Sequence, residues 1–119
     1  MNTAALPRLA LTAGEPAGVG PELLARLAAS PFPAELIAIS DAGLLERAAR
    51  ACNLELKIEP FDGARRARRA PGSLRLIEIP LREPEVPGQP VPHNAFHVLN
   101  ALARAADGCM AGEFDALVT

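Results

Sequence analysis

A glycine-rich turn near the start of the chain has the clearest potential to bind a ligand. It reads Leu-Thr-Ala-Gly-Glu-Pro-Ala-Gly-Val-Gly-Pro-Glu from Leu11 to Glu22. A strand-like run precedes it and a helix-like run follows it, so backbone N–H groups of the turn can face an anionic ligand at the start of a helix. The glycine spacing differs from Gly-x-Gly-x-x-Gly, and no Gly-Lys-Ser/Thr follows. On spacing alone, a purely structural turn is the favoured interpretation.

The two histidines, His93 and His97, are four residues apart, a spacing that can place both imidazoles on one helix face. The three residues between them supply neither a metal ligand nor a general base. We therefore expect a solvated helix terminus and assign no metal ligand within the chain. The sequence shows no carboxylate constellation and no supported Ser-His-Asp order, so no catalytic residue is assigned either.

One basic cluster contains Arg65, Arg66, Arg68 and Arg69. Such a cluster could bind phosphate or RNA. No aromatic side chains are interleaved with the arginines, and the chain as a whole has a net charge of −2. We therefore expect a solvated connector and no nucleic-acid partner.

The composition is that of a soluble globular protein or part of one. The 119 residues are 50% apolar and 22% charged, which is enough for one domain and too little for two. No apolar stretch approaches the roughly 20 residues that span a bilayer, and the first residues lack a secretory signal, so we expect a cytoplasmic protein without a membrane partner. Cys52 and Cys109 are far apart and fit reduced, buried thiols.

The apolar pattern alternates between strand-like and helix-like segments along the chain. Such alternation is typical of an α/β protein with helices on both faces of a largely parallel or mixed sheet, a three-layer α/β/α architecture. We expect strands over residues 8–12, 36–39, 54–59, 73–79 and 114–118, and helices over 21–29, 42–52 and 95–111. The strand over 54–59 alternates apolar and charged residues, which favours a place near a sheet edge, whereas 114–118 reads as a buried strand.

Capping residues and apolar stripes predict where the helices begin and which of their faces is buried. Ser40 or Asp41 can cap the second helix, and Asn94 can cap the third. The apolar stripe expected on the third helix is formed by Val98, Leu99, Leu102, Ala103, Ala106 and Met110. Phe61 to Gly72 and the proline-rich segment from Pro80 to Pro92 are expected to be connecting loops.

The sequence stops at Thr119, directly after the last expected strand. In open α/β sheets, the functional loops follow the carboxyl ends of the strands. We therefore expect residues 1–119 to be the amino-terminal part of the first α/β domain of a longer protein, that is, a partial domain.

Two blocks of sequence resemble one enzyme family. Gly-Glu-Pro-Ala-Gly-Val-Gly-Pro-Glu, from Gly14 to Glu22, closely resembles the amino-terminal turn of the 4-hydroxythreonine-4-phosphate dehydrogenase family of pyridoxine biosynthesis. The segment from Leu102 to Thr119 is similar to the helix and strand that lead into that family's substrate loop. More distantly, the first block resembles the turn of isocitrate and isopropylmalate dehydrogenases. The resemblance covers the whole chain and is weakest in its proline-rich middle.

The resemblance implies an oxidoreductase with an isocitrate/isopropylmalate dehydrogenase-like fold. It would use NAD (or NADP) to oxidise 4-phosphooxy-L-threonine, a phosphorylated hydroxyamino acid, with loss of carbon dioxide, in pyridoxal 5'-phosphate biosynthesis. The family is homodimeric and binds a divalent metal (Zn, Mg or Co) through histidines that follow the position matching Thr119. Only Gly14, Glu15, Ala17 and Gly18 carry over, as residues near the cofactor. The segment alone is therefore expected to be inactive.

Two alternatives stay open at this point. One is a related dehydrogenase acting on phosphothreonate or phosphoerythronate, because substrate choice depends on pocket residues that lie past Thr119. The other is a stand-alone α/β binding module that kept the turn without catalysis, which would need a complete core within 119 residues.

Overall fold

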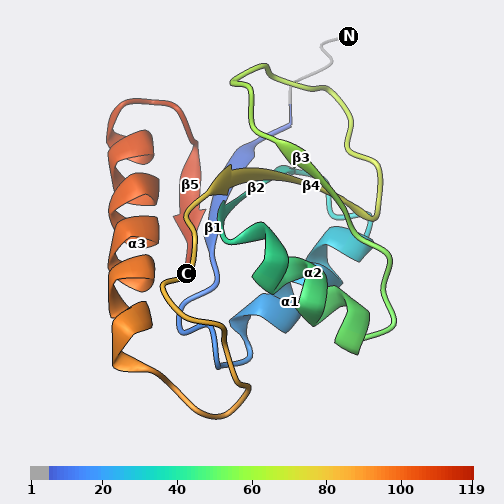
Figure 1. Cartoon of the computed structure of the whole chain (residues 1–119). Helices are drawn as coiled ribbons and strands as arrows, with labels where there is room; N and C mark the ends of the chain where they lie inside the picture. The colour runs from blue at the N-terminus through green and yellow to red at the C-terminus, as the bar shows by residue number, and fades with distance from the viewer. Residues whose placement is uncertain (1–5) are drawn as a thin grey trace, which may run out of the picture.

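A computed structural model describes residues 6–119 of the chain (Figure 1). The elements in chain order are β1 Arg8–Thr12, α1 Gly20–Ala29, β2 Glu35–Ser40, α2 Ala42–Ala51, β3 Lys57–Pro60, β4 Ser73–Glu78, the 3₁₀ turn η1 Pro92–Asn94, α3 Ala95–Met110 and β5 Ala116–Val118. Within this part of the chain, every helix is too short or too polar to cross a membrane.

The five strands form one parallel sheet in the order β3-β4-β2-β1-β5. In β1, Ala10 lies opposite Ile37 of β2 on one side and Leu117 of β5 on the other. Figure 1 shows α3 alone on one face of the sheet and α1 with α2 on the other. The expected three-layer α/β/α architecture is thereby confirmed.

Each face of the sheet has its own apolar core, because successive strand residues point to opposite faces. On the α1 and α2 face, strand residues such as Leu36 and Ala38 pack with Leu24 and Leu45. On the other face, the buried residues are Ala10, Ile37, Ile39, Ala101, Ala105 and Phe114. All six residues of β2 are buried, as expected for the central strand of a covered parallel sheet.

The two outer strands differ from their expected extents. β3 begins at Lys57 rather than Leu54, and it occupies the predicted edge position. β5 spans only three residues, lies at the opposite edge, and leaves the side chain of Val118 52% exposed. The prediction of a buried strand over 114–118 was therefore wrong for most of its residues, although Phe114 just before it is buried.

The face that α3 presents to the sheet is not the predicted one. Its buried residues are His97, Ala101, Ala105 and Gly108, whereas Leu99, Leu102 and Met110 of the expected stripe are exposed. Small residues let the helix approach the sheet closely. A Cβ added at Gly108 would lie 2.2 Å from a ring carbon of Phe114. Close packing therefore selects the small-residue face and leaves the larger apolar face outside.

Of the predicted caps, one is confirmed and one was wrong. The Asp41 carboxylate accepts a hydrogen bond from the Leu44 N–H at 2.9 Å and caps α2. Asn94 precedes α3 but forms no capping hydrogen bond. Its fully buried amide instead accepts from the N–H groups of Arg82 and Glu83 and donates to the Glu83 carbonyl. Asn94 therefore holds the proline-rich loop against the start of α3.

The arginine-rich connector between β3 and β4 is more ordered by side-chain contacts than the predicted solvated loop. The Arg69 guanidinium donates to the carbonyls of Ala28 at 2.8 Å and Ser73 at 3.2 Å. The Arg66 N–H donates to the Glu35 carboxylate at 2.9 Å. Arg69 thus satisfies carbonyl groups at the carboxyl end of α1, which have no partners within the helix.

Candidate functional site

The four predicted cofactor residues lie together in the turn that connects β1 to α1. Gly14 has a φ of 67°, in the left-handed region that favours glycine. The Glu15 carboxylate accepts a hydrogen bond from the Ala17 N–H at 3.1 Å, and the Gly18 N–H donates to the Glu15 carbonyl at 2.9 Å. Ala17 is buried and Gly18 is exposed. The turn therefore holds its own shape through local hydrogen bonds.

The turn closes tightly against the start of α1. A Cβ added at Gly20 would lie 1.8 Å from the carbonyl oxygen of Ala13, so only glycine fits there. Val19 precedes the helix, and no side chain accepts a hydrogen bond from the first turn as a cap. The first N–H groups of α1 are consequently left to solvent or to an anionic ligand.

The proline-rich loop is fastened beside this turn. The Gly88 N–H donates to the Ala17 carbonyl at 2.8 Å. The Asp41 carboxylate, which caps α2 with one oxygen, accepts from the Leu81 N–H at 3.0 Å with the other. Because β1, β2 and β4 are parallel, the segments that follow them meet at one edge, and these bonds join those segments into one surface.

A hollow of about 240 Å³ lies between the turn, α1, α2 and the proline-rich loop. Pro16 and Gly18 contribute to its wall from the turn, and Pro21 contributes from the first turn of α1. Arg47 of α2 donates to the Glu85 carboxylate at 2.8 Å, and this hydrogen bond lowers the pKa of Glu85. The volume is slightly below the roughly 300–1,000 Å³ of ordinary small-molecule pockets.

A half-buried thiol, that of Cys52, also lines this hollow. The Cys52 thiol donates to the Glu22 carboxylate at 3.3 Å. Desolvation, followed by this hydrogen bond, raises the pKa of Cys52. The thiol is therefore held in its protonated form, which is a poor nucleophile.

The burial of two polar side chains near the carboxyl ends of the strands was not predicted from the sequence. Ser40, the last residue of β2, and His97, in the first turn of α3, are at most 2% exposed. Neither the Ser40 hydroxyl oxygen nor the His97 Nδ1 has a hydrogen-bond partner among residues 6–119. The position of Ser40 at the carboxyl end of a strand was the available sequence signal. The prediction of a solvated His97 was wrong.

The histidines do not form a shared metal site. His93 is exposed and contacts the Glu83 carboxylate, whereas His97 is buried against the sheet. Across residues 6–119, no three His, Cys, Asp or Glu side chains are grouped so as to hold a metal ion. The arrangement at this edge can position an anionic or polar ligand through backbone N–H groups.

The sequence is similar to curated proteins named 4-hydroxythreonine-4-phosphate dehydrogenase. It is 45% identical over 114 residues to the protein from Vibrio cholerae, covering 94% of this chain and 34% of the relative. It is 46% identical over 116 residues to the protein from an Azoarcus species, covering 98% of this chain and again 34% of the relative. No protein-family model matches the chain.

Solved structures of proteins with this name agree in fold. The structure from Burkholderia phymatum matches 96% of this chain with a TM-score of 0.84 and 28% identity. A putative enzyme of the same name from Salmonella typhimurium matches 93% with a TM-score of 0.74 and 25% identity. The chain spans about a third of the length of these relatives, with 36% of each solved chain covered. These matches confirm the family resemblance found in the glycine turn and in the last helix and strand.

Proposed function

Because the chain is homologous to 4-hydroxythreonine-4-phosphate dehydrogenases along almost its whole length, we propose that it is the amino-terminal part of such an enzyme. Residues 1–119 would supply part of the first α/β domain and one wall of its cleft. The observation that carries the proposal is the 42–46% identity over nearly the entire chain.

In the proposed reaction, the secondary alcohol of 4-phosphooxy-L-threonine is oxidised to a ketone, and the product loses carbon dioxide. NAD (or NADP), when bound, supplies the hydride acceptor. Gly14, Glu15, Ala17 and Gly18 would form a rigid wall for the cofactor, because the turn is already fixed by its own hydrogen bonds. The uncapped start of α1 offers N–H donors to a negatively charged group of the ligand.

The described residues do not by themselves form a binding site for the divalent metal. The described part of the chain groups no three metal-ligating side chains. We therefore place the ligands of the divalent metal (Zn, Mg or Co) outside this chain, and we propose that the working enzyme is a cytoplasmic homodimer.

The decisive experiment compares this 119-residue chain with the natural gene product of which it would be a part. We expect the longer polypeptide to reduce NAD in the presence of 4-phosphooxy-L-threonine and the 119-residue chain to show no turnover. Turnover by the 119-residue chain would contradict the proposal that this segment is inactive on its own. A higher kcat/KM with phosphothreonate or phosphoerythronate would favour the related dehydrogenase instead.

A module without catalysis makes different predictions. In that case the intact mass of the natural gene product would equal 12.5 kDa, and the chain would melt cooperatively as a monomer.

The cofactor role of the turn has its own test in the longer polypeptide. Replacing Glu15 by Ala removes the carboxylate that holds the Ala17 N–H, so we expect a raised KM for NAD. Glu46→Ala, at an exposed position of α2, is the matched control. An unchanged KM in the Glu15 variant would leave the turn with a structural role only.

A further inference from the structure

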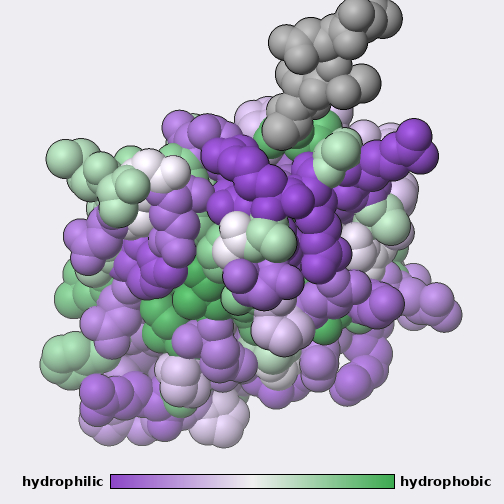
Figure 2. Space-filling view, turned by 90° about the horizontal axis from the view of Figure 1, so that it is seen from above, coloured by the Kyte–Doolittle hydropathy of each residue, from purple (hydrophilic) through white to green (hydrophobic). Residues whose placement is uncertain are grey.

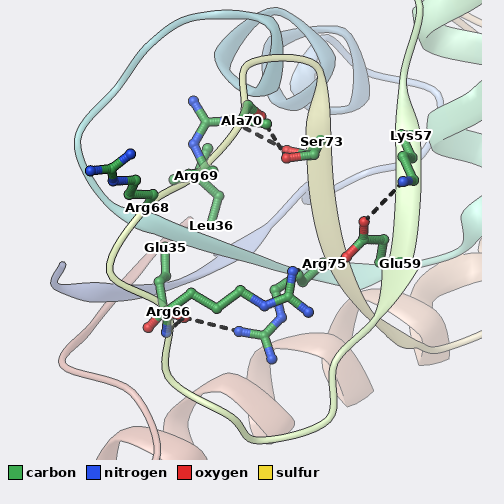
Figure 3. A pocket seen from close by; sticks show the side chains of 10 residues that line it. All are labelled: Glu35, Leu36, Lys57, Glu59, Arg66, Arg68, Arg69, Ala70, Ser73 and Arg75. Atoms are coloured by element: carbon green, nitrogen blue, oxygen red, sulfur yellow. Dashed lines mark hydrogen bonds and ion pairs between the residues drawn. The ribbon is translucent and has the colours of Figure 1, made fainter. Parts of the chain in front are cut away.

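A second hollow is lined by several cationic side chains. It lies where the strands begin, whereas the glycine turn lies where β1 ends. It has a volume of about 330 Å³ and lies between the connector over residues 61–72 and the first residues of β2, β3 and β4. Figure 3 shows Lys57 and Glu59 on one side of it, Arg66 and Arg75 below, and Arg69 with Ala70 across from them. The cations on its wall are Lys57, Arg66, Arg68, Arg69 and Arg75.

The carboxylates nearby neutralise only part of this charge. Glu35 is engaged by Arg8 at 3.2 Å and by Arg75 at 2.9 Å, and Asp62 also pairs with Arg75. These two arginines and two carboxylates balance one another. Glu59 is then the one carboxylate among the lining residues that can pair with the remaining cations of the wall.

Four cations on the wall remain beside that one carboxylate, and two of them contact it. Lys57 lies 3.5 Å and Arg66 3.1 Å from Glu59, and the Arg66 hydrogen bond is the largest cause of the lowered pKa of Glu59. Arg69 donates only to carbonyl oxygens. Arg68 is exposed and forms no hydrogen bond or ion pair with residues 6–119. The wall therefore carries an excess of about three positive charges.

A buried arginine gives an independent indication of an unused donor. Arg75 is 7% exposed and lines the hollow, yet its Nε has no partner among the described residues. A buried guanidinium N–H without a partner costs free energy, so the hydrogen-bonding capacity of Arg75 is not fully used within residues 6–119. Figure 2, which views the molecule from the connector side, shows strongly hydrophilic side chains gathered on this face.

We propose that this hollow binds a small phosphate-bearing molecule, at a site separate from the glycine turn. Arginine and lysine match the charge and acceptor geometry of a phosphate dianion. The volume exceeds that of one phosphate group, and Leu36 and Ala70 add apolar wall for the rest of a small ligand. Nucleic acid is disfavoured because no aromatic side chain lines the hollow as a stacking surface. The inference does not depend on the proposed dehydrogenase activity.

The test is calorimetric titration of the natural-length protein with inorganic pyrophosphate at low ionic strength. We expect saturable binding of pyrophosphate that depends on Lys57 and Arg66, with a Kd below about 1 mM and weaker binding as salt is added. Lys57→Gln and Arg66→Gln should each weaken binding about fivefold. Glu59→Gln should tighten it, because the substitution frees both cations from their carboxylate partner.

Matched controls separate this site from general charge effects. Arg50→Gln removes an exposed cation of α2, away from the hollow, and should leave the Kd unchanged. Thermal melts verify that each variant is folded. The proposal is overturned by the absence of saturable binding, by equal effects of Arg50→Gln and Arg66→Gln, or by an unchanged Kd in Glu59→Gln. It is also overturned if single-stranded RNA binds here in preference to pyrophosphate.

Discussion

At the residue scale, the most consequential contacts are those of the buried Glu35 carboxylate. It accepts hydrogen bonds from Arg8 and Arg75, and all three side chains are at most 8% exposed. The two guanidinium groups also lie 5.0 Å and 4.8 Å from the centre of the Phe61 ring. Charges this deeply buried are tolerated only when they are paired and hydrogen-bonded.

Replacing Glu35 by Gln is therefore expected to destabilise the chain by about 3–5 kcal/mol, because two buried arginines lose their shared counter-charge. Urea denaturation measures the loss. The control is Glu22→Gln, which breaks an exposed pair with Arg26 and should leave the free energy of unfolding nearly unchanged. Equal losses in the two variants would show that the Glu35 network does not stabilise the fold.

At the element scale, the passage from β1 into α1 depends on two glycines with different tasks. Gly14 supplies a backbone conformation with positive φ, and a Cβ there would meet nothing within 4 Å. Gly20 instead permits the first turn of α1 to touch the Ala13 carbonyl. One glycine sets the direction of the chain and the other permits close packing.

The two glycines should consequently respond differently to alanine. Gly20→Ala is expected to cost about 3 kcal/mol, the upper end of the usual overpacking penalty, because the clash is with backbone that cannot move without shifting β1. Gly14→Ala should cost about 1–2 kcal/mol, the penalty of a left-handed conformation. Thermal and urea unfolding of both variants provide the comparison. A cost for Gly14→Ala equal to or above that of Gly20→Ala would contradict this division.

At the scale of the whole molecule, the outer face of α3 exposes several large apolar side chains. Phe96 is 57%, Leu99 61%, Leu102 41% and Met110 89% exposed. The adjacent β5 pairs with β1 along one side only. Exposed apolar surface of this kind marks an interface. It supports the proposal that further polypeptide covers this side of the domain.

Charging this face gives a direct test. In the 119-residue chain, the double change Leu99→Glu and Leu102→Glu should alter the free energy of unfolding by less than about 0.5 kcal/mol, since both side chains already contact solvent. It should also reduce self-association in sedimentation velocity. In the natural-length protein, the same double change should be destabilising by several kcal/mol, because it would bury two charges.

The control for this test is Ala101→Glu, on the buried face of α3, which should unfold either form of the protein. Equal stability of the natural-length protein with and without the two glutamates would show that nothing covers the outer face.

A feature of the site could be predicted from the sequence when the residues that form it are close together in the chain. The glycine turn was found because its glycines and prolines act on their own backbone within a few residues. The fixing of that turn by Gly88, the clamp formed by Asn94 and the burial of His97 were missed. Each of these depends on where a distant segment of chain comes to lie.

The sequence by itself determined the order of the main helices and strands, an α/β architecture with a largely parallel or mixed sheet, Ser40 or Asp41 as the cap of the second helix, and the resemblance to one dehydrogenase family. Periodicity, turn chemistry and short motifs are local properties. Only the tertiary structure decided which face of α3 is buried. Leu99 and Leu102 are the more hydrophobic choice, but Ala101, Ala105 and Gly108 allow the closer approach to the sheet. It likewise decided that Arg69 and the Arg66 backbone tie the otherwise exposed arginine-rich connector to α1 and β2. The local sequence pattern allows more than one buried face for a helix and more than one partner for a charged side chain. Packing geometry and the pairing of distant charges select one of them.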